Sequence, residues 1–327
     1  FTKVFELSTD SLQARALISE NTRIVPEYIP PRLSLLSSVP NSSMVLMGAG
    51  DEDLYIFKFY NSGNERNLAG WSKWTMQTPI KMVEFAHDTG YFVGYNSQGE
   101  SVLSRLELID DPETSPIKAF GISFTPRLDH YIYDTQVTVT SVNSNTSRIT
   151  LPAGFAVTGS TPFLVATFQG TETFYESSSL QGDSSTNASY FDVSSDISSS
   201  QFIVGLGYTM SVTLPSFFVK SGENNQADRR NTPMIENVYI DLYYSGRYTA
   251  TIQKKGYLDR TVDLDVPKSD LYLANSAAID EFSTQAIAVY SRGDLAKITI
   301  SAPDPLPASF TSYSWEGHYS TRGIATR

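Results

Sequence analysis

The sequence contains no cysteine among its 327 residues. Structural disulfides, cysteine-ligated zinc and thiol nucleophiles are therefore excluded. Histidine is scarce as well, since only His87, His130 and His318 are present. None of them has a second histidine at the helical spacing of a metal-binding pair, and turn or surface positions are expected for all three. The sequence predicts no metal site, no cofactor and no catalytic residue of a familiar kind.

Basic residues and long apolar runs are also in short supply. The chain has 24 Lys and Arg against 35 Asp and Glu, a formal charge of −11 and a pI near 4.8. A protein that grips nucleic acid needs clustered Lys and Arg to neutralise phosphates. No apolar run approaches the roughly 18 residues of a transmembrane helix. The sequence argues against a nucleic-acid grip and a membrane-spanning segment, while DNA that merely passes the protein remains compatible with it.

Tyrosine and phenylalanine are abundant, with 19 and 18 residues. They fall in short runs that alternate polar and apolar residues and are separated by Gly, Asn, Asp and Ser, which is typical of β-strands. We therefore predict an all-β fold. One short helix is expected at Ser11 to Glu20, where Asp10 can act as the N-cap and Leu12 and Ala16 share a face.

Two regions are expected along the chain. Residues 1–110 read as a propeller-like β-meander that is part of a larger domain, because strands of about five to eight residues follow one another with short turns. The chain starts with Phe1 rather than Met, so we expect the natural N-terminus to lie upstream. Asp110 to Pro116 has the acids and prolines of a linker. Residues 111–327 are expected to form a β-sandwich-like region.

The aromatic residues of the first region have a clear facial pattern. From Leu54 to Tyr60, Tyr55 and Phe57 share one face of the expected strand. Trp71 and Trp74 lie on another strand at an odd spacing, so they point to opposite faces. This arrangement favours packing roles over a joint platform for stacking a sugar.

The second region contains a serine-dense stretch and a strong turn signal. Ser177 to Ser200 is expected to be a solvated loop. Ile235 to Tyr244 alternates as a strand, and Ser245-Gly246 predicts a hairpin turn into Tyr248 to Ile252. The strand is expected to place Val238, Ile240 and Leu242 on one face and Asn237, Tyr239 and Asp241 on the other.

Two pairs of acids come closest to a catalytic pattern. Glycosidases need two carboxylates about 5 to 10 Å apart, and Asp263 and Asp265 flank one residue of a strand, so both project to one face. Asp51 and Asp53 form a second pair. Solvent-facing acids and a charged turn explain these residues equally well, and we expect no catalysis from them.

Four stretches carry a resemblance to a known family: Val25 to Pro30, Tyr55 to Tyr60 followed by Gly70 to Trp74, Phe217 to Lys220, and Ser314 to Tyr319. In order and spacing they resemble the C-terminal half of the tail nozzle protein, or tail tubular protein B, of short-tailed bacteriophages (podoviruses). The last stretch, before a short basic tail, is the most specific. The residues that match the family motifs, with packing as their expected role, are Trp71, Trp74, Trp315, Glu316, Gly317 and Tyr319.

The resemblance implies a structural virion protein of the phage tail without enzymatic activity. It implies a homo-hexameric tube beneath the tail adaptor ring, with tail fibres as further candidate partners, through which DNA leaves the virion. A channel that must release DNA gains nothing from gripping phosphates, and an acidic lumen repels DNA. Arg229-Arg230 and Lys254-Lys255 are candidate contacts for DNA in the channel, although positions facing solvent explain these doublets as well.

Two other functions are compatible with the sequence. A carbohydrate-binding or glycoside-hydrolysing β-protein, such as a tailspike, would suit the aromatics and paired acids, and predicts a concave cleft with two carboxylates. A secreted adhesion module is suggested by the sequons at Asn41, Asn145 and Asn187, but the lack of disulfides counts against it.

Overall fold

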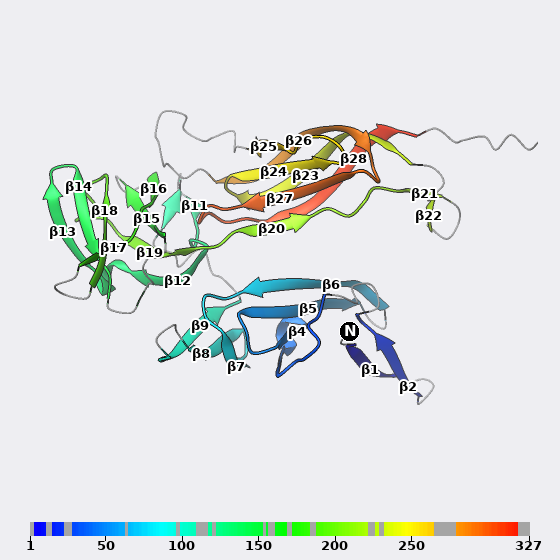
Figure 1. Ribbon diagram of the computed structural model, residues 1–327, viewed down its shortest axis with the longest axis horizontal. Helices are drawn as coiled ribbons and strands as arrows, with labels where there is room; N and C mark the ends of the chain where they lie inside the picture. The colour runs from blue at the N-terminus through cyan, green and yellow to red at the C-terminus, as the bar shows by residue number, and fades with distance from the viewer. Residues whose placement is uncertain are drawn as a thin grey trace, which may run out of the picture. The chain divides into compact units, whose positions relative to one another are not determined.

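The computed structural model describes residues 3–10, 15–22, 28–62, 65–95, 99–108, 117–119, 122–152, 155, 161–168, 172–183, 188–221, 226–228, 232–264 and 279–319. The described residues form β-strands and short 3-10 turns, with no α-helix among them, and the predicted all-β fold class is confirmed (Figure 1). The chain divides into two compact units, residues 1–110 and 111–327. We call them the N-terminal and C-terminal units.

The N-terminal unit consists of one hairpin and two antiparallel sheets. The hairpin pairs β1 with β2, one sheet has the order β3-β4-β5-β6, and the other has the order β7-β8-β9. The strands are β1 Phe5–Asp10, β2 Arg15–Glu20, β3 Leu35–Val39, β4 Met44–Gly48, β5 Asp53–Ser62, β6 Glu65–Thr75, β7 Ile80–Ala86, β8 Thr89–Tyr95 and β9 Ser101–Glu107.

The expected helix at Ser11 to Glu20 is wrong. Residues 15–20 form β2, and residues 11–14 lie outside the described part of the chain. Strand β2 pairs in register with β1 from Phe5↔Glu20 onward, and the hairpin is closed by a hydrogen bond from the Asn21 amide to the Val4 carbonyl (2.9 Å). Cross-strand pairing therefore overrides a local sequence rich in good helix formers.

The two larger sheets of the N-terminal unit bury a common core. Leu46, Leu54 and Ile56 come from β4 and β5, while Val83 and Phe92 come from β7 and β8. All five are at most 5% exposed. This face-to-face packing uses one face of the β3-β4-β5-β6 sheet and leaves its other face for the aromatic residues described below.

The C-terminal unit contains two bodies, each made of two sheets. In the first body the sheets have the orders β12-β19-β15-β16 and β13-β14-β18-β17; in the second they have the orders β20-β27-β24-β25 and β26-β23-β28. Two small hairpins, β10–β11 and β21–β22, complete the unit. The strands are β10 Lys118–Ala119, β11 Ile122–Ser123, β12 Leu128–Tyr133, β13 Thr138–Asn143, β14 Thr146–Thr150, β15 Pro162–Phe168, β16 Glu172–Ser177, β17 Gln181–Asp183, β18 Ala188–Val193, β19 Phe202–Gly207, β20 Met210–Thr213, β21 Val219–Ser221, β22 Gln226–Asp228, β23 Met234–Ser245, β24 Tyr248–Lys254, β25 Arg260–Leu264, β26 Asp280–Arg292, β27 Ala296–Ala302 and β28 Phe310–His318.

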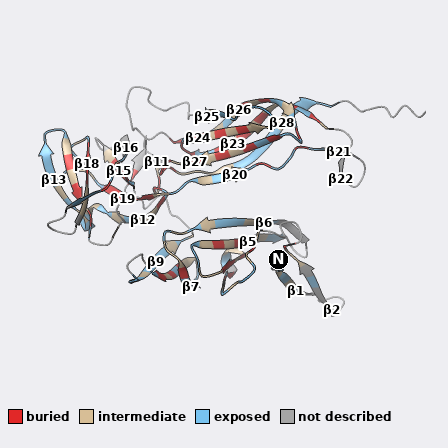
Figure 2. Cartoon of the chain, viewed as in Figure 1, coloured by how far each residue is buried: buried red, intermediate tan, exposed pale blue. Residues whose placement is uncertain are grey.

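Each body has its own core, and a third cluster joins them (Figure 2). The joining cluster brings Leu128 and Val165 of the first body together with Leu306, which follows β27. The expectation of a solvated loop at Ser177 to Ser200 is wrong, because this stretch contains β17 and β18. Phe191 and Val193 of β18 are fully buried in the first core, where alternate apolar residues of the strand face inward.

The predicted hairpin between Ile235 and Ile252 is also wrong. Strand β23 pairs with β26 and β28, whereas β24 pairs with β25 and β27, so the chain crosses from one sheet to the other at residues 245–247. The crossing is packed tightly: a β-carbon on Gly246 would lie 2.6 Å from Leu306. The buried Ser245 hydroxyl and the Tyr248 phenol lie 3.1 Å apart, which links the end of β23 to the start of β24.

Candidate functional site

Trp71 and Trp74 lie on opposite faces of β6. The Trp71 ring packs against Phe57 and Tyr28, with ring centroids 4.9 and 6.4 Å away, and its indole N–H donates to the Asn21 carbonyl (3.1 Å). Trp74 packs on the core between the two sheets of the N-terminal unit. The two indoles therefore serve different interfaces and form no common platform.

The acids at the start of β5 hold a turn together. Asp51 accepts the backbone N–H of Asp53 (3.2 Å). Asp53 in turn accepts from the Lys73 ammonium (3.1 Å) and the Thr75 hydroxyl (2.8 Å) on β6. Burial and the neighbouring Asp53 charge raise the pKa of the Tyr55 phenol beside them. This arrangement is a cross-strand lock between β5 and β6.

The motif residues near the C-terminus lie on β28, at the edge of the second body. Trp315 packs on the core from inside, 6.2 Å from the Phe217 ring. Gly317 faces the β23 backbone so closely that a β-carbon would lie 2.0 Å from the Met234 carbonyl oxygen. Only glycine fits at this position. Tyr319, just after the strand, is 52% exposed.

The outward face of the β26-β23-β28 sheet carries two carboxylates held by neighbouring strands. We call it the outer face; its residues include Asn237, Tyr239, Asp241, Tyr243, Phe282, Thr284, Ala286, Ser312, Ser314 and Glu316. Lys and Arg are absent from this set. The alternation of β23 predicts its own outward residues, but the partners from β26 and β28 follow only from the sheet order.

Asp241 occupies the middle of the outer face. Its carboxylate accepts hydrogen bonds from the Thr284 hydroxyl (2.8 Å) on one side and the Ser312 hydroxyl on the other. These donors, Ser312 first, lower the pKa of the Asp241 carboxyl. The charge of this acid is thereby fixed in position by two strands.

Glu316 is held in the same way further along the sheet. Its carboxylate accepts from the Asn237 side-chain amide and the Tyr239 hydroxyl, which lower its pKa. The same bond raises the pKa of the Tyr239 phenol. The outer face thus presents ordered negative charge among hydroxyl, amide and aromatic side chains.

Two of the four basic candidates can be placed. Lys254 ends β24 and Lys255 begins the following turn, where Lys255 is exposed. Arg229 and Arg230 lie outside the described residues, as does Asp265, while Asp263 is exposed on β25. The predicted Asp263 and Asp265 pair therefore lies partly outside the described residues.

The histidines show no metal-ligand geometry. Within the described ranges, no cluster of three or more His, Asp or Glu residues could hold a metal ion. His318 lies 3.0 Å from the Glu236 carboxylate, and His87 and His130 occupy left-handed backbone conformations with φ of 58° and 44°.

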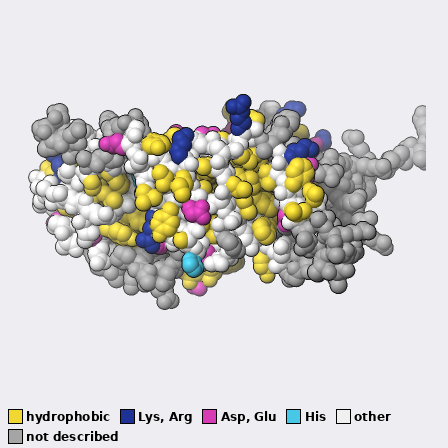
Figure 3. Space-filling view, turned by 90° about the horizontal axis from the view of Figure 1, so that it is seen from below, with side chains coloured by type: hydrophobic (Ala, Val, Ile, Leu, Met, Phe, Trp, Pro, Cys, Tyr) yellow, Lys and Arg dark blue, Asp and Glu magenta, His cyan; other side chains and the backbone are white. Residues whose placement is uncertain are grey.

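In the described part of the chain, no helix has the length and apolar character needed to span a membrane. On the face drawn in Figure 3, hydrophobic side chains reach the surface in several places and charged ones are scattered.

A family model described as bacteriophage nozzle protein matches residues 1–326. The chain belongs to the bacteriophage nozzle protein family. The nozzle chain is thus a structural component of the phage tail and part of a multimeric tail assembly in the virion.

Solved structures similar to the nozzle chain include an exo-β-1,3-galactanase from Phanerochaete chrysosporium with galactose (10% identity, 84% of this chain, 78% of that chain, TM-score 0.15). A variant of that enzyme with β-1,3-galactotriose is similar at 10% identity, over 86% of this chain and 80% of that chain, with a TM-score of 0.16. TM-scores this low carry no argument about fold or function. No curated protein matches the chain.

Proposed function

We propose that the nozzle chain assembles into a hexameric tube that forms the tail channel for DNA retention and ejection, without enzymatic activity. The match of the nozzle family over residues 1–326 carries this proposal. The tail adaptor ring is its expected neighbour in the virion, and tail fibres are further candidate partners. Residues 1–110 contribute a propeller-like meander and residues 111–327 a sandwich-like platform to the tube.

The carboxylates support a structural role rather than hydrolysis. Glycoside hydrolysis needs two carboxylates about 5 to 10 Å apart that face a substrate cleft. Asp53 is occupied by Lys73 and Thr75, and Asp241 is occupied by hydroxyl donors on both sides. No observation on the described residues favours the carbohydrate-active alternative.

The charge of the chain supports a channel that releases DNA. Six chains of −11 each carry a formal charge of about −66. Phosphate repulsion from this charge opposes adhesion of DNA to a wall, within about 8 to 10 Å at physiological salt. Lys254 and Lys255 are the candidate DNA contacts that lie within the described residues. Two lysines per chain supply a weak contact with DNA rather than a grip.

The experiment has two arms. Mass photometry of the purified chain tests the tube, for which we expect a six-subunit particle. Titration with double-stranded DNA at low salt tests the channel, for which we expect binding weaker than micromolar. The Lys254→Gln/Lys255→Gln variant should weaken that binding further without changing the particle mass. Sub-micromolar binding with a steep salt dependence would show that the protein grips DNA, and this reading of the channel would be wrong.

A further inference from the structure

The turn between β24 and β25 displays apolar side chains to solvent. Leu258 is 95% exposed and Tyr257 is 78% exposed, more than any other large hydrophobic residue among those the structure describes. They lie in residues 255–259, at the end of a hairpin whose strands pair from Tyr248↔Leu264 to Ile252↔Arg260. We call Tyr257 and Leu258 the apolar tip. A tip of this kind is a candidate contact for another molecule.

The apolar tip is held in place by hydrogen bonds around it. The Tyr257 amide donates to the Lys254 carbonyl (3.0 Å), and the Lys255 amide donates to the Leu295 carbonyl (3.3 Å) in the neighbouring turn. The Gln253 side chain donates to Asp259 (2.8 Å). The tip is therefore an ordered projection, which lowers the entropy lost when it docks.

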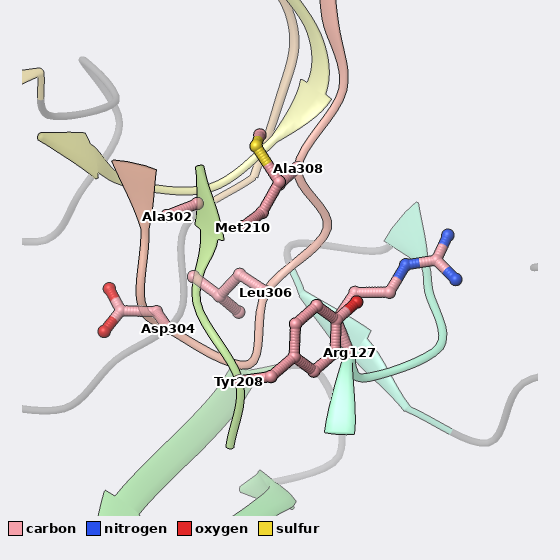
Figure 4. Close-up of a pocket in the computed structure, with 7 residues that line it drawn as sticks. All are labelled: Arg127, Tyr208, Met210, Ala302, Asp304, Leu306 and Ala308. Atoms are coloured by element: carbon pink, nitrogen blue, oxygen red, sulfur yellow. The ribbon is translucent and has the colours of Figure 1, made fainter. Parts of the chain in front are cut away.

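The same unit contains an apolar recess at the opposite end of the same sheet (Figure 4). Its volume is about 50 Å³. That is roughly the space of four water-sized groups, enough for one leucine side chain. Asp304 at the recess is paired with Arg247 (3.0 Å), so its charge is already compensated. The residues that line the recess are Arg127, Tyr208, Met210, Ala302, Asp304, Leu306 and Ala308.

A chain cannot fill its own recess. Lys254, at the base of the tip, pairs with Ala296 at the start of β27, whereas Ala302 lies at the far end of that strand. Six strand residues separate these ends by about 20 Å. The projection and the recess thus face opposite ends of one rigid sheet, which is the arrangement that a head-to-tail contact between identical copies requires.

We propose that the apolar tip of one nozzle subunit docks into the recess of the next subunit around the tube. This inference rests on the proposed tube and identifies a contact that closes it. A second copy is favoured because both complementary surfaces occur on every chain and the family assembles into multimers. A DNA phosphate offers no apolar surface against which Leu258 could be buried. The recess does, because Leu306 and Ala302 line it.

The absence of native cysteine allows a direct test. In the Leu258→Cys/Ala308→Cys variant, mild oxidation with diamide should link the assembled copies into a ladder of disulfide-bonded multimers. Each single variant should give no ladder. The matched control is Leu258→Cys/Ala286→Cys, because Ala286 is an exposed alanine on the outer face of the other sheet. This control should give no ladder either.

A second variant measures the contribution of the contact. Leu258→Asp should fold normally, since the side chain is exposed, and should shift the particle mass from the ring toward single chains. If the wild-type protein forms a ring but the Leu258→Cys/Ala308→Cys variant gives no ladder, the docking contact is overturned while the tube stands. The same conclusion follows if Leu258→Asp leaves the ring intact. A wild-type protein that forms no ring would overturn the tube and the contact together.

Discussion

Replacing Gly317 with alanine should destabilise the C-terminal unit, although alanine usually stabilises a glycine position by about 0.4 to 1 kcal/mol through the unfolded chain. The added β-carbon would lie 2.0 Å from the Met234 carbonyl oxygen and 3.0 Å from the carbonyl carbon. Both are backbone atoms of β23, so β28 must retreat by about 1 Å. The retreat should lose one or two hydrogen bonds of the β23–β28 ladder, and overpacking costs about 1 to 3 kcal/mol. We expect a net loss of about 1 to 3 kcal/mol.

Urea unfolding followed by Trp315 fluorescence measures this loss in a Trp71→Phe/Trp74→Phe background, where Trp315 is the remaining tryptophan and reports on the affected sheet. Two protein concentrations separate folding from assembly. Gly182→Ala is the matched control, since a β-carbon at Gly182 has no neighbour within 4 Å. It should change the free energy of unfolding by less than about 0.5 kcal/mol. A Gly317→Ala protein as stable as its parent would refute the close approach of β23 and β28.

Three further predictions concern the same strands and the N-terminal aromatics. The lowered pKa of the Asp241 carboxyl contributes stability that is present above its unfolded pKa, near 3.9, and is lost as pH falls through the folded pKa. Asp241→Asn should therefore flatten the fall in urea midpoint between about pH 5 and pH 2. An unchanged slope would contradict the hydrogen bonds from Thr284 and Ser312 to Asp241. Tyr248→Phe removes the phenol that meets Ser245 and should cost about 0.5 to 1.5 kcal/mol by urea unfolding, with an unaltered midpoint counting against that bond. Saturating glycans should leave the fluorescence of Trp71 and Trp74 unquenched; joint quenching of both would show a sugar platform.

Period-two patterns predict much of the strand content. The strand expected from Leu54 to Tyr60 lies within β5, and the outward alternation of β23 is as its sequence predicts. Alternation is local, so it survives whatever the strand pairs with. The helix predicted at Ser11 to Glu20 was wrong because residues 15–20 pair with the strand Phe5–Asp10 instead. Helix propensity is a property of the local sequence and takes no account of such a pairing partner.

The sheet order could not be read from the sequence. Ser245-Gly246 has turn chemistry, but a hairpin and a crossing between facing sheets use the same residues, and only Leu306 and the later strands decide between them. The hydrogen bonds to Asp241 could not be predicted for the same reason, since the hydroxyl donors Thr284 and Ser312 lie 43 and 71 residues further along the chain. Composition showed that the chain is acidic, and only the three-strand register shows where two of the charges are fixed.

The sheet order has a consequence for synthesis of the protein. Strand β23 lies between β26 and β28, and both neighbours are translated after it. At about 5 to 20 residues per second, the interval from Ser245 to His318 lasts roughly 4 to 15 seconds. Both edges of β23 are open until β26 is complete at Arg292, and the edge that pairs with β28 stays open until the end of the interval, a feature that invites misassembly between nascent chains. A ribosome that stops before Phe310 would therefore release a subunit with one edge of β23 still open, whereas completion of the last strand closes it.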